Sequence, residues 1–415
     1  MNKFLQIQKQ ILFLSFFICH FSVPAQQPAV FLDSLLKASL PQFAGVLNNP
    51  AKYKLQIVYT KIDRDKNNKP SFTDYKLHTT KKYFYPASTV KLPVSLLALI
   101  KLEELNIQGL NKNTAMVADS AFYCQKKFSA DPTSETGYPT IENYIRKMFL
   151  VSDNLACARV YDFVGFDYAH KKLNAWGYKN VRLLNKLDGQ CPGDTAKISP
   201  PIYFLSEVKD TVYKQPLTFF SENLTHPIPD SKIGRAIKGH QPKDFSKHNY
   251  MTVSDLHSMM RKIIFNNYLN EDERLPISDT SRKFMIKYLG LYPKESVYPK
   301  YDPKIYYDSF KKYFLYGSAV ATIKQDSIRV INIVGRAYGF LIDCAYIVDF
   351  KNNVEYLLTG ALYVNGRNTF GTGRYEYDNI GLPFLKELGW SIYTYERSRK
   401  KDYEPDLREI EGLFK

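Results

Sequence analysis

The order of the strand and helix patterns constrains the fold of this chain more than any other sequence feature. Segments rich in β-branched and aromatic residues lie near the two ends, at 55–60, 75–78, 329–334, 344–350 and 354–364. Apolar residues at helical spacing cover 29–40, 87–104, 140–150, 155–164, 252–265, 279–289 and about 382–395. Because strands from both ends must share one sheet, we expect an α/β (α+β) fold: an antiparallel sheet from both chain ends, flanked by helices, with an inserted all-helical subdomain.

No internal repeat divides the chain, so we expect one domain over residues 26–415. Its sheet subdomain should comprise about 26–84 and 312–415, and its helical subdomain about 85–311. Within the latter, residues 189–250 are rich in proline, lysine and polar side chains. This composition predicts a long irregular insertion, which in a compact domain is usually functional or mobile.

Residues 1–25 have the pattern of a secretory signal peptide. Lys3 and Lys9 precede an apolar run over 11–18, and Val23-Pro24-Ala25 forms a small-x-small cleavage site. The apolar run is too short to cross a bilayer. We therefore expect an exported protein, periplasmic or secreted, with no stable membrane span after cleavage.

The formal net charge of +16 favours anionic partners. Scattered lysines that only solvate the surface explain the same charge. The chain has no zinc-finger spacing, no RNA-binding aromatic signature and no basic helix, so we expect no nucleic-acid partner. Anionic polymers of the cell envelope, or a small-molecule substrate, suit an exported monomer better.

Cysteine and histidine spacing gives no sign of a metal site. Cys124, Cys157, Cys191 and Cys344 form no C-x-x-C pair, and the histidines form no H-E-x-x-H. We expect no metal and no cofactor. An oxidising compartment permits one or two disulfides among these cysteines, and their spacing leaves the pairing open.

Ser88-Thr89-Val90-Lys91 is an S-x-x-K motif at the start of a strongly apolar helix. One helical turn brings Lys91 to the same face as Ser88, where a neutral amine can take the serine proton. Apolar surroundings and the positive helix N-terminus both favour the neutral amine. The same spacing occurs at four other serines, so the motif alone is weak, and Ser88 as a helix cap beside a surface lysine is the alternative. The other occurrences begin at Ser34, Ser206, Ser309 and Ser398.

Ser152-Asp153-Asn154 is the only S-D-N sequence in the chain and lies between two expected helices. A hydroxyl at this point can pass a proton to a leaving nitrogen, and an asparagine amide can hold a substrate carbonyl or the lysine amine. A helix-capping turn is the alternative interpretation.

S-x-x-K followed by S-D-N, in this order of elements, resembles the class A β-lactamase family and its penicillin-recognising relatives. The resemblance covers nearly all of the chain after the signal peptide. It implies a serine hydrolase in which a β-lactam or related amide acylates Ser88, Lys91 is the base, Ser152 relays the proton and Asn154 positions the substrate. It also implies an oxyanion hole formed by the backbone N–H groups of Ser88 and Arg336.

The third family signature, K-T-G, falls at Ile333-Val334-Gly335, where the lysine is missing. The resemblance implies that Val334, Gly335 and Arg336 bind substrate. Losing a charge-assisted hydrogen bond of about 1.5 to 3 kcal/mol weakens carboxylate recognition roughly 10- to 150-fold. Arg336 is the cation that we expect to compensate.

The family glutamate that activates the deacylating water corresponds to Asp188. Aspartate is shorter by about 1.5 Å of reach, and a misplacement of about 1 Å costs around a hundredfold. The resemblance therefore predicts slow hydrolysis of the acyl-enzyme. Asp188 as a plain turn residue before Gly189 is the alternative.

Three functions fit these residues. The first is a β-lactamase-like serine hydrolase that forms an acyl-enzyme. The second is a peptidoglycan D,D-peptidase or transpeptidase that uses the same Ser88 and Lys91. The third, which Ile333 and Asp188 motivate, is a non-catalytic envelope protein that keeps the fold and binds polymers.

Overall fold

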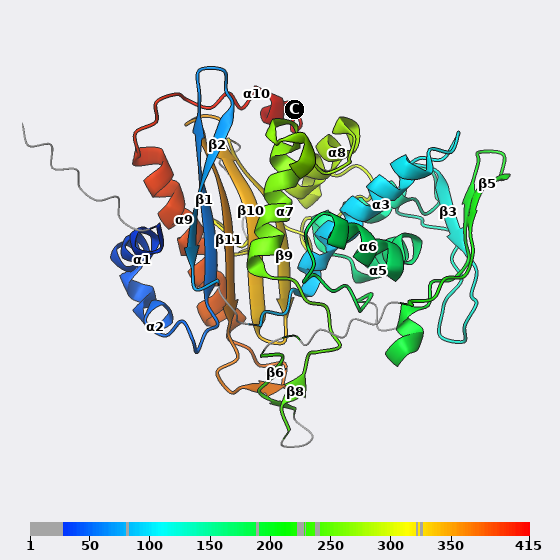
Figure 1. The fold of residues 1–415 in the computed structure, drawn as a ribbon, viewed down its shortest axis with the longest axis horizontal. Helices are drawn as coiled ribbons and strands as arrows, with labels where there is room; N and C mark the ends of the chain where they lie inside the picture. Colours follow the sequence, from blue (N-terminus) through cyan, green and yellow to red (C-terminus); the bar gives the residue numbers. More distant parts are fainter. Residues whose placement is uncertain are drawn as a thin grey trace, which may run out of the picture.

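A five-stranded antiparallel sheet forms the centre of the molecule (Figure 1). The computed structural model describes residues 28–79, 83–187, 191–221, 228, 230–236, 241–320, 323 and 327–415. The sheet order is β2-β1-β11-β10-β9, and β1 pairs with β11, so the N-terminal strands join the C-terminal ones. This confirms the fold class that the sequence predicts. The strands are β1 (Gln56–Arg64), β2 (Pro70–Leu77), β9 (Ile328–Ala337), β10 (Phe340–Asp349) and β11 (Val354–Tyr363).

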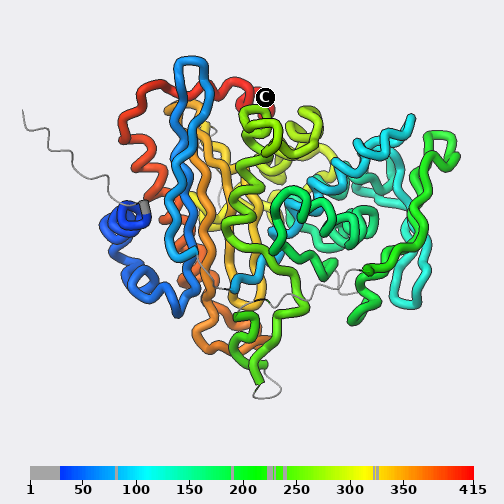
Figure 2. Tube along the Cα trace, viewed as in Figure 1, coloured from blue at the N-terminus to red at the C-terminus, as the bar shows by residue number. Residues whose placement is uncertain are grey.

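Helices cover both faces of this sheet (Figures 1 and 2). One face packs against the N-terminal helices α1 (Pro28–Ser39) and α2 (Ala44–Leu47) and the C-terminal α9 (Leu382–Ser398). The other face packs against α7 (Val253–Phe265) and α8 (Asp279–Gly290), beyond which lie the remaining helices. Every residue of β10 and β11 is buried, as expected for strands covered on both sides.

The helices that follow the first hairpin meet beside the edge strand β9. The helix α3 (Lys91–Leu105) is buried almost all round, because it lies at the centre of this part of the molecule. Capping side chains begin α4 (Ile141–Val151) and α5 (Asn154–Val164): Thr140 accepts a hydrogen bond from Asn143 N at 3.0 Å, and Asp153 accepts one from Ala156 N at 2.9 Å. A short helix, α6 (Phe166–Ala175), completes the group.

The described part of residues 189–250 is irregular over most of its length, and it also contains five short strands that its composition does not predict. Two of them extend β3 (Ala115–Ala118) into a three-stranded antiparallel sheet. The prolines 200, 201 and 216 lie just outside these two strands, where their missing N–H costs no ladder hydrogen bond. The five strands are β4 (Ile202–Leu205), β5 (Thr211–Gln215), β6 (Lys232–Ile233), β7 (Arg235–Ala236) and β8 (Lys243–Asp244). The boundaries of the sheet and helical subdomains stay predictions.

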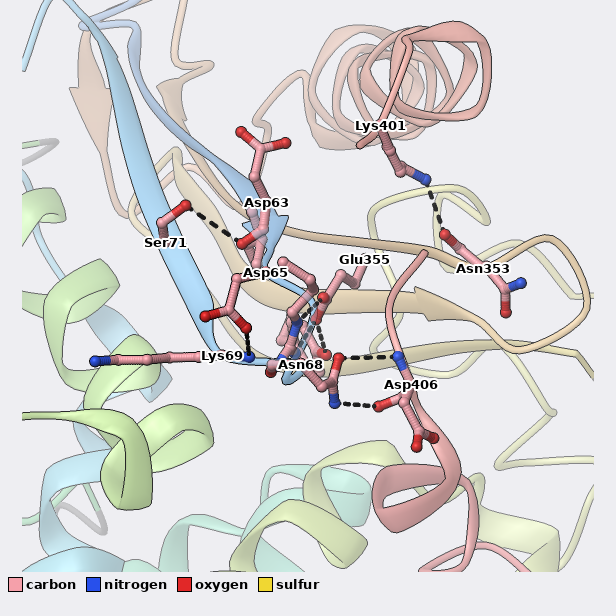
Figure 3. Close-up of polar contacts among 12 residues, drawn as sticks. Asp63, Asp65, Asn68, Lys69, Ser71, Asn353, Glu355, Lys401 and Asp406 are labelled. Atoms are coloured by element: carbon pink, nitrogen blue, oxygen red, sulfur yellow. Dashed lines mark hydrogen bonds and ion pairs between the residues drawn. The ribbon is translucent and has the colours of Figure 1, made fainter. Parts of the chain in front are cut away.

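Polar contacts tie the C-terminal segment to the far end of the sheet (Figure 3). Arg64 of β1 forms a buried two-pronged ion pair with Glu355 of β11, at 2.5 and 2.8 Å. In the turn after β1, the Asn68 side chain exchanges two hydrogen bonds of 3.0 Å with the backbone of Asp406. The chain from α9 to the short helix α10 (Arg408–Glu411) is thereby held across the end of the β1–β2 hairpin.

The predicted signal peptide, residues 1–25, lies outside the described residues. No single described helix is long and apolar enough to cross a membrane, although one sharply bent pair, residues 29–39 with 41–47, has suitable length and composition.

Candidate functional site

Ser88 lies in a short 3₁₀ turn, Ala87–Val90, that leads directly into α3. The preceding residue, Ala87, has a φ of +48°, a left-handed conformation that costs energy for a residue with a Cβ. The strand β9 comes very close to this turn at Gly335, where an added Cβ would lie 2.5 Å from Pro86 O. Gly335 therefore acts by permitting the approach of strand to turn, and no larger residue fits without a shift.

Lys91 lies at the centre of a cluster of polar side chains from three elements. Its Nζ is 2.8 Å from Ser88 Oγ and 3.2 Å from Ser152 Oγ, and it donates to Asn154 Oδ1 at 2.7 Å. Ser152 ends α4 in a left-handed conformation with a φ of +61°, and Asn154 begins α5. The side chain of Asp153 caps α5 and does not contact Lys91 Nζ. The structure therefore brings together four residues that the sequence singled out, namely Ser88, Lys91, Ser152 and Asn154.

Burial lowers the pKa of Lys91 to about 8, because the charged amine has lost its water. The side chain has no exposed surface, and the charges of Cys157 and Asp153 oppose the shift only partly. At pH 7 roughly a tenth of such an amine is neutral, compared with well under a thousandth at its usual pKa. The amine is thus a far better proton acceptor than an exposed lysine.

A cleft of about 350 Å³ gives access to this cluster and includes Ser88 and Asn154 in its lining. Aromatic side chains form part of the wall: the ring of Tyr85 lies 5.4 Å from that of Tyr338 and 6.0 Å from that of His248. No sequence motif pointed to these residues. Tyr338 and Gly339 form a two-residue turn between the strands β9 and β10, and both have a positive φ. An aromatic residue followed by glycine between two apolar segments was the local sequence signal that Tyr338 lies in a tight turn at the end of the sheet.

A disulfide joins Cys124 to Cys191, and Cys191 lines the cleft. The segment that precedes Cys191 in the sequence is held by Asn249. The Asn249 side-chain oxygen accepts hydrogen bonds from Leu184 N and Asn185 N at 2.6 and 2.8 Å, and these bonds fix the chain that leads to Leu187. Asp188, the candidate deacylation base, lies outside the described residues. Cysteine spacing had left the pairing open, and the fold decides it.

The residues of the K-T-G position divide between the two faces of β9. Val334 is buried in the core on the side of α1 and α9, so its side chain does not face the cleft, and its backbone alone is left to bind substrate as the resemblance implies. Ile333 is buried in the core on the other face, because successive side chains of a strand alternate. Arg336 is exposed and lines the cleft, with its guanidinium 5.3 Å from the ring centre of Tyr377.

The cluster offers two hydroxyls, one partly neutral amine and one amide, which is a set suited to nucleophilic attack and proton transfer. In the described part of the chain, no group of three or more His, Cys, Asp or Glu side chains is arranged to hold a metal ion.

Comparison with known proteins gives one family match and several similar solved structures. The model of the β-lactamase enzyme family matches residues 42–368. Solved structures with similar folds include β-lactamases from Sphaerobacter thermophilus and Xanthomonas campestris and the protein PBP-A as an acyl-enzyme complex with penicillin G, each at 12% identity. The alignments cover 89%, 87% and 90% of this chain and 98%, 97% and 98% of those chains, with TM-scores of 0.48, 0.49 and 0.48, respectively. No curated protein matches the sequence.

The family match begins just before α2, includes the Ser88–Lys91–Ser152–Asn154 cluster and ends after β11, and so covers well over half of the chain. The protein belongs to the β-lactamase enzyme family.

Proposed function

We propose that this protein is an exported serine hydrolase that forms an acyl-enzyme at Ser88 with a β-lactam or a related amide. The observation that carries the proposal is the position of Lys91 Nζ, within hydrogen-bond distance of the hydroxyls of both Ser88 and Ser152. One amine can then remove a proton from one hydroxyl and pass it to the other.

The neutral amine has two N–H groups and one lone pair, and the cluster supplies a partner for each. Asn154 Oδ1 and Ser152 Oγ can accept the two hydrogens, which leaves the lone pair to accept the proton of Ser88. As Ser88 Oγ attacks the amide carbonyl, its proton moves to Lys91 Nζ. The C–N bond then breaks as Ser152 gives a proton to the leaving nitrogen and receives one from Lys91.

The backbone N–H groups of Ser88 and Arg336 are the donors that we assign to the developing oxyanion. They depend on backbone position alone, and the contact of Gly335 with Pro86 brings the strand that carries Arg336 next to the turn that carries Ser88. Replacing the family lysine by Ile333 therefore leaves these donors in place.

Two features support export. The N-terminal residues have the pattern of a signal peptide, and the Cys124–Cys191 disulfide is of the kind that persists in oxidising compartments. We place the mature protein in the periplasm or outside the cell.

An intact-mass experiment with penicillin G tests the proposal. The wild-type protein should gain the mass of one penicillin, and Ser88→Ala should gain none. Ser206→Ala is the matched control, because Ser206 belongs to another S-x-x-K segment and should leave the adduct unchanged. Absence of an adduct on the wild type with both penicillin and a serine-reactive fluorophosphonate would exclude a reactive Ser88.

A second reaction of the same centre is a peptidoglycan D,D-peptidase or transpeptidase activity. The observation that favours it is Asp188, which is shorter than the family glutamate and predicts slow attack by water on the acyl-enzyme. A long-lived adduct, together with release of D-alanine from an acyl-D-Ala-D-Ala peptide, would favour this reaction. Rapid recovery of the unmodified mass would favour the β-lactamase reaction.

A further inference from the structure

Two cations associated with the strand β9, which borders the Ser88 turn, have no acidic partner among the described residues. One is Arg336, at the end of β9; the other is Lys311, in the segment that precedes this strand. Among the described residues, no carboxylate forms an ion pair with either side chain, and the charge effects on Lys311 come from cations alone. A protein rarely gathers unpaired cations in a half-enclosed place unless an anion binds there.

The backbone of Lys311 is hydrogen-bonded to the edge strand β9 at Asn332, the residue before Ile333. Asn332 Nδ2 donates to Lys311 O at 3.0 Å and to Asp343 Oδ1 at 2.8 Å. The next residue, Lys312, donates from its buried Nζ to Val330 O at 2.8 Å and to Asn332 Oδ1 at 2.9 Å. These buried contacts fix the place of Lys311 relative to the strand that borders the nucleophile.

The conformation of Lys311 is unusual for a residue with a long side chain. Its φ is +62°, in the left-handed region, and its backbone N–H donates to Ser318 Oγ at 3.3 Å. The Nζ lies 5.1 Å from the centre of the Phe310 ring, which supports the cation on one side. Strain of this kind persists where the surrounding structure imposes it, and it is concentrated at functional sites.

The amine of Lys311 interacts electrostatically with Lys91 and with Arg336, which lines the cleft. Burial first, and then the positive charges of Arg336 and Lys91, lower its pKa to about 8. The amine is therefore within Coulombic range of both the base and the exposed end of β9. A bound anion would reverse this repulsion and keep Lys311 charged.

We propose that Lys311, assisted by Arg336, binds the carboxylate of the substrate and so does the work of the family lysine that Ile333 replaces. This inference rests on the proposed acyl-enzyme function and names the substrate class: an amide or lactam that carries a carboxylate close to the scissile bond. A penicillin and a peptide with a free C-terminus share this chemistry.

The test compares two probes that differ only in this charge, penicillin G and its methyl ester, by the rate of Ser88 acylation in intact-mass experiments. The wild type should react at least tenfold faster with the acid than with the ester. In Lys311→Gln, the rate of Ser88 acylation by the acid should be about 10- to 100-fold lower than in the wild type. The rate with the ester should stay within about twofold of the wild-type rate. Lys311→Arg should keep the preference for the acid, and Lys304→Gln, an exposed lysine of the same segment, should change neither rate.

The two hypotheses fail in different ways. No labelling of the wild type by either probe overturns the proposed function, and this inference with it. Labelling by the ester with no advantage for the acid, or an equal loss of both rates in a folded Lys311→Gln, overturns only the role of Lys311. If circular dichroism shows that Lys311→Gln does not fold, Lys311→Arg decides: the acid preference must survive in it.

An acyl-D-Ala-D-Ala peptide and its C-terminal amide, used as competitors of ester labelling, distinguish the two sources of the carboxylate. Stronger competition by the free acid than by the amide, lost in Lys311→Gln, assigns the site to peptides as well as lactams. Equal competition by acid and amide restricts the site to lactams.

Discussion

Lys91 and Lys312 are both buried lysines with lowered pKa values, yet they lie in different chemical surroundings. Burial lowers the pKa of Lys91 to about 8 and that of Lys312 to about 7, and the nearby Asp343 opposes the shift at Lys312. Lys312 donates to three fixed acceptors, Leu289 O, Val330 O and Asn332 Oδ1. Lys91 instead contacts two hydroxyls and an amide beside an open cleft.

The comparison shows that a perturbed pKa alone does not identify a catalytic lysine. Backbone carbonyls can only accept hydrogen bonds, so Lys312 has no proton to receive from them. Hydroxyls can give and take protons, so a neutral amine at Lys91 can accept a proton from one hydroxyl and pass it to another. The lowered pKa measures burial in both places, and the partners decide what the amine can do.

Lys91→Met gives the largest expected effect. Without the general base, the rate of acylation of Ser88 by penicillin G should fall by about 10³-fold. Stability should not fall, because methionine fills the site without the cost of burying an amine. The rate is followed by intact mass and the stability by urea unfolding; a variant that keeps more than a tenth of the wild-type rate would contradict the role of Lys91.

The pH dependence of acylation should show the ionisation of Lys91. The base works only when neutral, so with a pKa of about 8 the rate should rise about fiftyfold from pH 6 to pH 8 and level off above that. Asn154→Asp places a carboxylate against the amine, raises its pKa and should move the midpoint up by about one pH unit. A flat profile, or an unmoved midpoint in this variant, would separate the rate from Lys91.

Lys312→Met should have the smallest effect on the rate and a clear effect on stability. Three buried acceptors lose their donor, so the free energy of unfolding in urea should fall by about 3 kcal/mol. Labelling of the folded variant by a fluorophosphonate, which carries no carboxylate, should stay within about twofold of wild type. A loss as large as that of Lys91→Met would mean that the two lysines do not differ in the way their partners indicate.

The local sequence predicted much of the fold and half of the candidate site. The strands near both ends and the helices between them follow from apolar spacing, and Ser88, Lys91, Ser152 and Asn154 follow from two short motifs. Spacing within one helical turn brings Lys91 to Ser88. The meeting of Lys91 with Ser152 depends on the packing of α3 against α4 and α5, which a motif order can suggest only by resemblance.

The other half of the site had no local signal. The strands within 189–250, the pairing of Cys124 with Cys191 and the aromatic wall with Tyr85 and His248 each depend on contacts between distant segments. The burial of the Val334 side chain also had no local signal, because a motif alignment gives the position of a residue along a strand, while the covering helices determine which face is the core.

By itself, the sequence determined which groups we propose to react: a serine, a lysine one helical turn away and a second hydroxyl between two helices. Those chemical identities and that one-turn spacing are local properties of the chain. Only the tertiary structure decided that Lys91 would be buried from water, which hydroxyls it would contact and which other cations would act on it. Burial and electrostatic potential arise from segments far apart in sequence, so the pKa of Lys91 and the position of Lys311 exist only in the folded protein.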